Sequence, residues 1–274
     1  MRPFFKFLCS GLFVLSVSVA SAQTVISNTP KKCSHVFKAG QVFNEPLYFV
    51  STQRQLRGSS IEVIHELRKR TGCEFLVEEY SRPSLIEKFR HSQVDISVVS
   101  VKTIEMDNVA RFIHLYDSPR SLVVGPKWAR KVKSVPQFVN KKKIIFGNII
   151  GTQTYYDLSE YELLRKEKRL IDLPDYPSLF KALEENRIQG FIGSFMISSY
   201  HMNKMGLKNY STIVDDKFSV PIGCYIDPKR LSEQEVQMFR QVLLDMLKDG
   251  TFVKIYSQFI PLELAQKSII PISF

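Results

Sequence analysis

The sequence predicts an α/β fold in which helices flank a mostly parallel sheet and the chain forms two similar lobes. From residue 34 onward the expected elements alternate as strand, helix, strand, helix, strand, an order typical of a parallel sheet. An internal repeat adds to this. PSLIEKFRHSQVDISVVS, from Pro83, aligns without gaps with PSLFKALEENRIQGFIGS, from Pro177. Two such helix–strand units in one chain indicate two α/β lobes that face each other.

The first 22 residues have the pattern of an export signal. Arg2 and Lys6 supply a positive start, and the mostly apolar run from Phe7 to Ala20 is short for a membrane span of about 20 residues. The small residues at positions 20–22, Ala-Ser-Ala, suit a cleavage site, so the mature chain is expected to begin at Gln23. No later segment is long and apolar enough to span a membrane. The sequence therefore predicts a soluble protein that is exported.

The net charge of the chain indicates which classes of binding partner are favoured. Without Arg2 and Lys6 the chain keeps 36 of its 38 basic residues against 27 acidic ones, a net charge of +9. A basic exported protein is attracted to anionic membrane surfaces or acidic partners. Apart from the lysine run at 141–143 and RKEKR at 165–169, the basic residues are dispersed, which is typical of solvated helix faces and loops. This dispersion, together with export, argues against nucleic acid as a partner.

Three cysteines remain in the mature chain. Cys33 and Cys73 each immediately precede an expected strand, and neighbouring parallel strands would bring those two starts together. In an oxidising compartment we expect these two to form a disulfide. Cys224, in SVPIGCYI, has the surroundings of a buried small apolar residue.

The first lobe is built from alternating strands and helices. A strand is expected at residues 34–40, and SSIEVIHELRKRTG is expected to form a helix that begins with a capping box of Ser59 and Glu62 and ends at Gly72. CEFLVEEY is the next strand. A helix at 83–91 and a strand at 94–99 complete the unit.

The second region begins after the strand SLVVGPK. KIIFGNI is expected to form a strand, Gly151-Thr152 a tight turn and residues 153–165 a helix, whose N-terminus would suit a carboxylate or a phosphate. Near FSVPIGCYI the chain returns to the first lobe, and its last helices are LSEQEVQMFRQVLLDMLKDG, capped by Ser232, and TFVKIYSQF. The expected division is therefore a signal peptide at 1–22, lobe 1 at 23–120, lobe 2 with the hinge strands at 121–219, and a return to lobe 1 at 220–274.

Open α/β sheets bind ligands at the carboxyl ends of their strands. Loops 43–49, 80–82 and 100–107 of the first lobe are therefore expected to face loops 151–154 and 194–195 of the second across a cleft.

Taken in this order, the segments resemble the periplasmic solute-binding proteins of family 3, the polar amino-acid binders of ABC importers. The similarity covers nearly the whole mature chain and rests on EPLYFVSTQRQLRGSSIEVIHELRKRTG, PSLIEKFRHSQVDISVVS, IIGTQTYYDL, PSLFKALEENRIQG and LLDMLKDGTFVKIYSQF. It implies a two-lobe, type II periplasmic-binding-protein fold joined by two hinge strands. It also implies a monomer without a cofactor that closes on a small polar solute and hands it to the membrane permease of an importer.

The resemblance also indicates where the usual amino-acid site is altered. In relatives the loop after the strand at 94–99 carries a hydroxyl and then an arginine that clamps the α-carboxylate with two hydrogen bonds. Ser100 or Thr103 can supply the hydroxyl, but the arginine position falls on Met106 or Asp107. Relatives usually place an aspartate for the ligand's ammonium group at the position of Ser194, which carries no charge.

Other candidate ligand residues follow from the same resemblance. Gly151, Thr152 and Gln153 match the family's GTQ-type turn, which would meet an anionic group. Arg82 can replace the missing arginine, as can Arg111, for which we expect a helical surface position.

The side chains expected to contact the ligand beyond its anionic group belong to the first lobe. Tyr48, Phe49 and Tyr80 lie where relatives have aromatic walls, and Glu45 can bind a cationic group.

Two alternatives stay open beside the binding protein. Some proteins that resemble this family, such as cyclohexadienyl dehydratases, perform chemistry in the same cleft, but no HExxH, GxSxG or paired CxxC motif occurs here and the five histidines have no partner at recognisable spacing. The lobes can also serve as a sensor or partner-binding module that has lost amino-acid binding. A non-enzymatic binding protein for an amino acid or related compound is the preferred prediction, and no metal or cofactor is expected.

Overall fold

The computed structural model describes residues 33–150 and 153–272, which belong to one compact unit. The predicted signal peptide, Gly151 and Thr152 lie outside the described residues. No described helix is long and apolar enough to cross a membrane.

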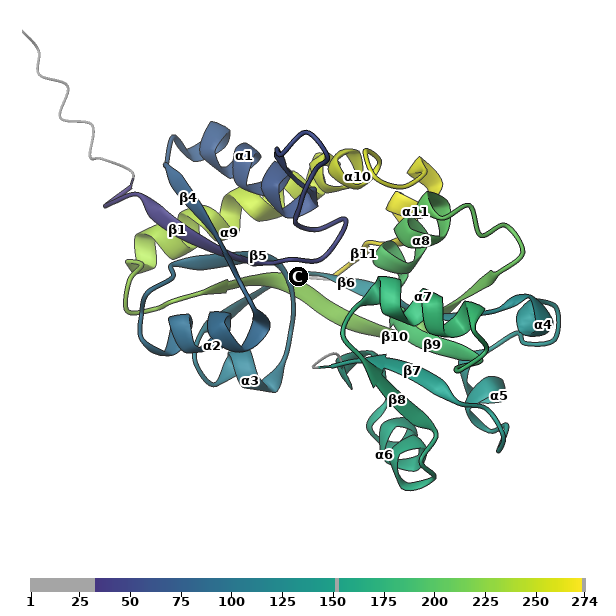
Figure 1. The fold of residues 1–274 in the computed structure, drawn as a ribbon. Coiled ribbons are helices and arrows are strands. Elements are labelled where there is room, and N and C mark those ends of the chain that lie inside the picture. The colour runs from purple at the N-terminus through teal and green to yellow at the C-terminus, as the bar shows by residue number, and fades with distance from the viewer. Residues whose placement is uncertain (1–32, 151–152, 273–274) are drawn as a thin grey trace, which may run out of the picture. The chain divides into compact units, whose positions relative to one another are not determined.

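Strands and helices alternate through both halves of the chain (Figure 1). The strands are β1 (Phe37–Val42), β2 (Phe49–Val50), β3 (Leu56–Arg57), β4 (Phe75–Tyr80), β5 (Ile96–Val101), β6 (Arg111–Val124), β7 (Phe146–Ile149), β8 (Leu170–Leu173), β9 (Gly190–Ser194), β10 (Ser211–Ile226) and β11 (Ile270–Pro271). The helices are α1 (Ser59–Thr71), α2 (Arg82–Arg90), α3 (Ile104–Asp107), α4 (Pro126–Ala129), α5 (Val135–Val139), α6 (Leu158–Lys166), α7 (Tyr176–Glu184), α8 (Phe195–Lys204), α9 (Glu233–Lys248), α10 (Thr251–Tyr256) and α11 (Leu262–Lys267), with a 3₁₀ turn η1 (Gln153–Tyr155).

Two long antiparallel strands, β6 and β10, connect the halves of the main sheet. Among the described residues its order is β4-β1-β5-β10-β6-β9-β7-β8, with β11 beside β6. Strand β1 pairs in parallel with β4 and β5, and β7 pairs in parallel with β8 and β9. Strands β6 and β10 pair with each other along most of their length. The last residues of β6, 120–124, pair with β9 of the second half, and the last residues of β10, 222–226, pair with β5 of the first half. The predicted α/β fold is thus confirmed, with β6 and β10 as the two connecting strands.

The predicted disulfide is present. Strands β1 and β4 are parallel neighbours in which Phe37 pairs with Phe75. The cysteines just before these strands, Cys33 and Cys73, are bonded with their Cα atoms 5.6 Å apart. Cys224 is a buried free thiol, as its apolar surroundings indicated, and burial raises its pKa to about 12.

Helix α1 covers the predicted residues, but its N-cap is not the predicted one. Gly58 is its N-cap, with φ 131° and no side-chain cap, so the expected capping box of Ser59 and Glu62 is wrong. Ser59 is already the first helical residue, and its N–H donates to the carbonyl of Pro46 (2.9 Å). A Cβ at position 58 would lie 2.1 Å from the carbonyl oxygen of Leu47, so this close approach requires glycine. The predicted stop at Gly72 is confirmed by its left-handed conformation, φ 73°.

The internal repeat is confirmed in three dimensions. Helix α2 and strand β5 correspond to α7 and β9, and each helix–strand turn has a residue with positive φ, Ser92 at 51° and Asn186 at 56°. Beneath each helix a glycine allows close packing. A Cβ at Gly40 would lie 2.5 Å from a methyl group of Leu85, and one at Gly147 would lie 2.3 Å from the matching methyl of Leu179.

The predicted helix at 153–165 is wrong in its first turn. Residues 153–155 form only η1, and α6 begins at Leu158. Asp157 interrupts the helix because its side chain accepts a hydrogen bond from the N–H of Ser159, while Glu160 accepts one from the N–H of Asp157, a complete capping box. The N-terminus of α6 is therefore already occupied by the protein's own carboxylates. The anion site predicted at the N-terminus of a helix that begins at residue 153 has no helix there.

Candidate ligand-binding cavity

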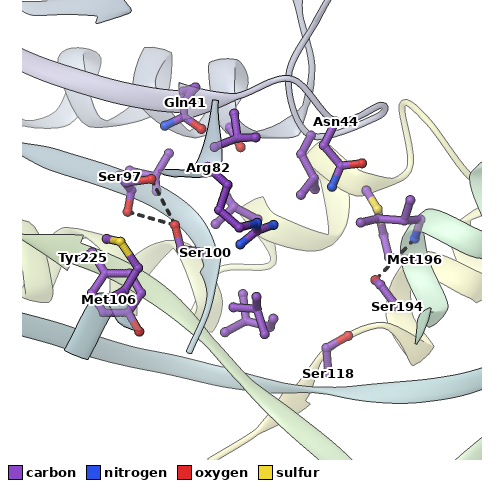
Figure 2. A pocket seen from close by; sticks show the side chains of 18 of the residues that line it. Gln41, Asn44, Arg82, Ser97, Ser100, Met106, Ser118, Ser194, Met196 and Tyr225 are labelled. Atoms are coloured by element: carbon purple, nitrogen blue, oxygen red, sulfur yellow. Dashed lines mark hydrogen bonds between the residues drawn. The ribbon is translucent and has the colours of Figure 1, made fainter. Parts of the chain in front are cut away.

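A cavity lined by many polar side chains lies between the two halves of the sheet (Figure 2). The cavity has a volume of about 120 Å³. A cavity of about 150 Å³ holds a molecule of the size of benzene, so this space suits a small solute. Its described polar lining is Gln41, Asn44, Ser60, Arg82, Ser97, Ser100, Ser118, Tyr116, Tyr155, Tyr176, Ser194, Tyr225, Tyr256 and Ser268. Apolar walls include Leu47, Met106, Met196 and Ile222.

Arg82 supplies the charge of this cavity. Figure 2 shows its guanidinium between Ser100 on one side and Ser194 on the other. It forms no hydrogen bond or ion pair within the described residues. Burial lowers the pKa of Arg82, against smaller opposing effects of Tyr155, Glu105 and Tyr176. The side chain of Glu105, on helix α3, is exposed and does not line the cavity.

The position of Arg82 follows from the start of helix α2. Ser81 is the N-cap and accepts a hydrogen bond from the N–H of Ser84 (3.3 Å), and Pro83 occupies the first turn. Arg82 is therefore the first helical residue, at the carboxyl end of β4. This is the edge of the sheet where ligands bind in open α/β folds.

No other formally charged side chain lines the cavity within the described residues. Arg82 is half-buried, and a partly desolvated guanidinium without a carboxylate in hydrogen-bond contact is unfavourable, because its desolvation is only partly offset. The site is thus electrostatically suited to an anionic group.

Two serine hydroxyls of strand β5 lie together on the cavity wall. Ser97 and Ser100 are three residues apart and would point to opposite faces of a regular strand. Val99 between them has φ 54°, which β-branched residues rarely adopt, and the pairing of β10 with β5 shifts register opposite it. The hydroxyls consequently lie 3.1 Å apart and both line the cavity (Figure 2).

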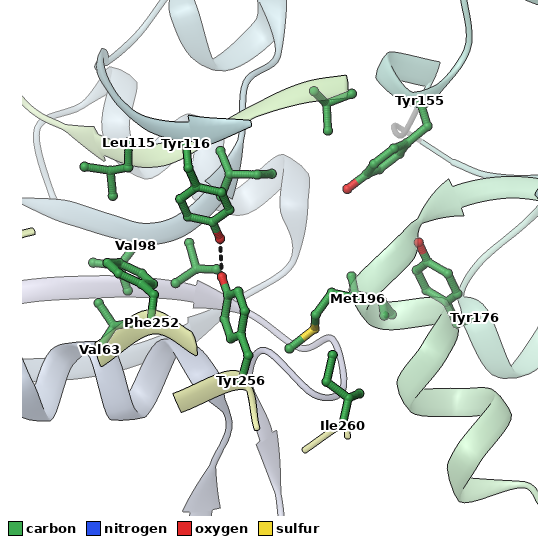
Figure 3. Packing of buried hydrophobic residues seen from close by; sticks show 14 of the residues in the cluster. Val63, Val98, Leu115, Tyr116, Tyr155, Tyr176, Met196, Phe252, Tyr256 and Ile260 are labelled. Carbon is green, nitrogen blue, oxygen red and sulfur yellow. Dashed lines mark hydrogen bonds between the residues drawn. The ribbon is translucent and has the colours of Figure 1, made fainter. Parts of the chain in front are cut away.

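The second half contributes hydroxyls rather than charge. Ser194 caps helix α8 by accepting from the N–H of Ile197 (3.4 Å), and its own N–H donates to the hydroxyl of Tyr176 (2.8 Å). Tyr155, from η1, lies beside them, and burial raises the pKa of both tyrosines. Figure 3 shows these two tyrosines on one side of the space and the hydrogen-bonded pair Tyr116 and Tyr256 on the other.

Two buried polar atoms of the lining have no partner in the described part of the chain. They are Nε2 of Gln41 and Oγ of Ser60, in residues that are 3% and 1% exposed. A buried donor without a partner is costly, by about 1–3 kcal/mol, so such atoms suit a ligand or a water. Sequence reasoning missed both. The available signal is a glutamine within the otherwise apolar strand FKAGQV.

The predicted loop residues divide between the cavity and other roles. Arg82, Ser100 and Ser194 line it, as does Met106, one of the two positions at which the family arginine was expected. The other, Asp107, instead accepts a hydrogen bond from Tyr225 (2.9 Å).

Thr103 and Glu45 lie outside the cavity lining. Thr103 caps α3 by accepting from the N–H of Met106 (3.3 Å). Glu45 forms an ion pair with Lys204 of helix α8, across from the first half of the sheet.

The expected aromatic wall also lies elsewhere. Tyr48 is only 3% exposed and is buried without lining the cavity, and Phe49 packs against Phe259. Tyr80 donates to Glu78 on its own strand. Strand β4 runs at the edge of the sheet, which takes its side chains away from the space between the halves.

Arg111 and the second-lobe turn complete the comparison with the sequence. Arg111 starts strand β6 instead of lying on a helix, and its exposed side chain pairs with Glu233 (2.9 Å). Of the predicted turn, Gly151 and Thr152 lie outside the described residues, and the backbone of Gln153 opens η1.

Comparisons with solved structures agree with the architecture. An ancestral arginine-binding protein bound to arginine superposes with a TM-score of 0.66 at 16% identity, over 82% of this chain and 97% of its own. AncCDT-1, described as an ancestral amino-acid-binding protein and a precursor of cyclohexadienyl dehydratase, gives 0.65 at 17%, over 82% and 95%. The second substrate-binding domain of GlnP from Lactococcus lactis, in an open conformation, gives 0.61 at 15%, over 84% and 96%. These likenesses confirm the two-lobe, type II fold predicted from the sequence.

Sequence comparison gives the family. No match was found among curated proteins. The profile of bacterial extracellular solute-binding proteins, family 3, matches residues 40–261, which is most of the chain. The protein therefore belongs to family 3 of the bacterial extracellular solute-binding proteins.

Proposed function

We propose that the protein captures a small carboxylate-bearing solute, an amino acid or a related compound, in the periplasm and delivers it to the permease of an ABC importer. The observation that carries the proposal is Arg82, a guanidinium in the cavity without a carboxylate partner among the described residues. The family and the amino-acid-binding proteins among the structural neighbours support the class of solute.

Arg82 takes over the role for which relatives use the arginine of the next loop. Of the two candidate positions for that arginine, Met106 has an apolar side chain that is 6% exposed, and Asp107 accepts a hydrogen bond from Tyr225. A charge-assisted hydrogen bond contributes about 1.5–3 kcal/mol, and a guanidinium can form two with one carboxylate. Ser97 and Ser100 stand beside it as further hydrogen-bonding groups.

The opposite end of the ligand meets hydroxyls. Ser194 and Tyr176 cannot neutralise an ammonium group as a carboxylate would, and Glu45 is already paired with Lys204. Among carboxylates the cavity therefore favours compounds without an α-ammonium group, such as 2-oxo or 2-hydroxy acids, over the corresponding amino acids.

The architecture supplies the movement that capture needs. We infer that lobes at residues 23–120 and 121–219, with the return segment 220–274, close over the solute by bending β6 and β10, and that the protein acts as a monomer. Export through the segment 1–22 belongs to the same proposal.

A thermal-shift screen tests the proposal. The protein is purified after export and is scanned with amino acids, each beside its 2-oxo and 2-hydroxy acid, and with dicarboxylates, oligopeptides, sugars and polyamines. A ligand at a hundred times its Kd adds about 2.7 kcal/mol of stability. We expect hits among small carboxylates, and product analysis of each hit separates binding from turnover.

Substitutions then locate the site. Arg82→Gln should weaken binding of a hit about 100-fold, close to 3 kcal/mol, whereas Arg111→Gln, which removes an exposed cation, should leave the Kd within about twofold. Full affinity in the Arg82 variant, or hits confined to uncharged sugars or polyamines, would refute the assignment.

A further inference from the structure

Most of the net positive charge of the mature chain comes from one segment. Residues 126–145, PKWARKVKSVPQFVNKKKII, contain seven basic residues and no acidic residue, in a mature chain of net charge +9. We call this group the cationic face: Lys127, Arg130, Lys131, Lys133, Lys141, Lys142 and Lys143. The remainder of the mature chain is close to neutral.

Lys127 lies on helix α4, three further basic residues lie between α4 and α5, and the lysines 141–143 lie in the turn before β7. Figure 1 shows α4 and α5 beside β9 and β7. Lys127 and the lysines 141–143 line one surface depression with Trp128. The ammonium groups of Lys127 and Lys141 lie 5.9 and 5.8 Å from the centre of the Trp128 ring. No residue of the segment lines the ligand cavity, so the face is separate from that site.

The cationic face is not neutralised by the protein. None of its seven side chains forms an ion pair with a carboxylate in the described part of the chain, and all except the half-buried Lys141 are exposed. The other basic stretch, RKEKR at 165–169, behaves differently. Arg165 pairs with Asp172 (2.6 Å) and Arg169 with Glu167 (2.7 Å).

The composition of the face indicates its partner. Stable protein interfaces have an apolar centre and are depleted in lysine. Here the valines, Phe138 and Ile144 are buried beneath the surface, and no large aliphatic side chain of the segment is exposed. Exposed lysine and arginine side chains instead suit the headgroup region of an anionic bilayer, where each cation adds about 1 kcal/mol. Trp128 packs on Phe138 with its Nε1 buried, so it lies beside these cations as a reporter rather than as an anchor.

We propose that the cationic face docks the protein on the anionic phospholipid surface of the membrane that it faces after export. The docking would hold the protein near membrane-embedded partners independently of whether the cavity is filled. Acidic proteins and nucleic acids are the competing occupants.

Trp128 makes the test direct because it is the single tryptophan of the chain. The exported protein, its N-terminus established by mass spectrometry, is mixed with phosphatidylglycerol–phosphatidylcholine vesicles or with pure phosphatidylcholine vesicles. Co-sedimentation measures binding, and quenching of the indole by nitroxide-labelled lipid reports whether this face meets the bilayer. We expect binding and quenching with the anionic vesicles, loss of both in 0.5 M salt, and neither with phosphatidylcholine.

Two triple variants with equal changes in net charge distinguish the effect of where the lysines lie from the effect of total charge on vesicle binding. K141Q/K142Q/K143Q should weaken binding to anionic vesicles at least about tenfold. K229Q/K248Q/K254Q, at exposed lysines elsewhere, should weaken it less than about threefold. Equal losses in the two variants, binding without quenching of Trp128, or binding only to an acidic protein or to DNA would each overturn the proposal.

Discussion

Arg82 and Tyr176 occupy equivalent positions in the two halves of the repeat, and both side chains line the cavity. Each is the first residue of its helix, after the N-caps Ser81 and Asp175, and each is followed by proline. The same local start of a helix thus delivers a cation from one half and a hydroxyl from the other to a shared space.

The ligand-free protein should be more stable without Arg82. Its half-buried guanidinium forms no ion pair with a carboxylate in the described residues, so Arg82→Gln should raise the free energy of unfolding by about 1 kcal/mol while it weakens ligand binding. Urea denaturation without ligand measures the change. Arg111→Gln serves as the control and should shift stability by less than about 0.5 kcal/mol. Destabilisation of the Arg82 variant would mean that the guanidinium has an internal role in the unliganded fold.

Tyr176→Phe should destabilise the protein by about 1–3 kcal/mol. The tyrosine hydroxyl accepts the hydrogen bond of the buried N–H of Ser194 (2.8 Å), and its loss leaves that donor without this partner. Tyr161→Phe is the matched control, because its hydroxyl accepts from the partly exposed side chain of Arg165 and should contribute less than about 1 kcal/mol. Denaturant midpoints of the two variants give the comparison. Equal effects would show that the Ser194 N–H finds another acceptor.

Lys204→Met should weaken ligand binding about twofold to fivefold. Its ammonium group on α8 pairs with Glu45 of the first half, so the contact stabilises the arrangement in which the halves enclose the cavity. The pair is partly exposed, which limits its contribution to about 1 kcal/mol. Calorimetric titration with an identified ligand measures the change, and Lys181→Met, which removes a lysine paired within its own helix, should have no effect. Unaltered affinity in the Lys204 variant would show that the pair does not favour the closed form.

Glu235 should make the fold sensitive to acid. Burial alone would raise its pKa, but hydrogen bonds from Ser34 and Ser232 outweigh this and lower the pKa to about 2 from 4.5. Since the folded-state pKa is depressed, the stabilisation is complete above pH 4.5 and is lost as the pH falls toward 2. It amounts to about 3 kcal/mol. Thermal unfolding from pH 7 to pH 2.5 should show a steeper decline for the wild type than for Glu235→Gln. Parallel curves would exclude Glu235 as a source of the acid sensitivity.

Much of the fold was predictable because it depends on short-range features. The repeat, the stop of α1 at Gly72, the cap of α9 at Ser232 and the order of strands follow from periodicity and from turn and capping residues that act within a few positions. The pairing of Cys33 with Cys73 followed from one further step, the adjacency of two parallel strands.

Tertiary structure decided the composition of the cavity. The sequence offered both Arg82 and Arg111 as replacement cations, but only the first residue of α2 lies at the cavity edge, whereas β6 directs Arg111 to Glu233. From the sequence alone, Glu45 is a candidate to bind a cationic group of the ligand. In the structure it pairs with Lys204, 159 positions away, a contact that no local sequence pattern predicts. The physical reason is common to these cases. Secondary structure is determined by neighbours along the chain, whereas the surroundings of a charge are determined by whichever distant elements the packed sheet places beside it.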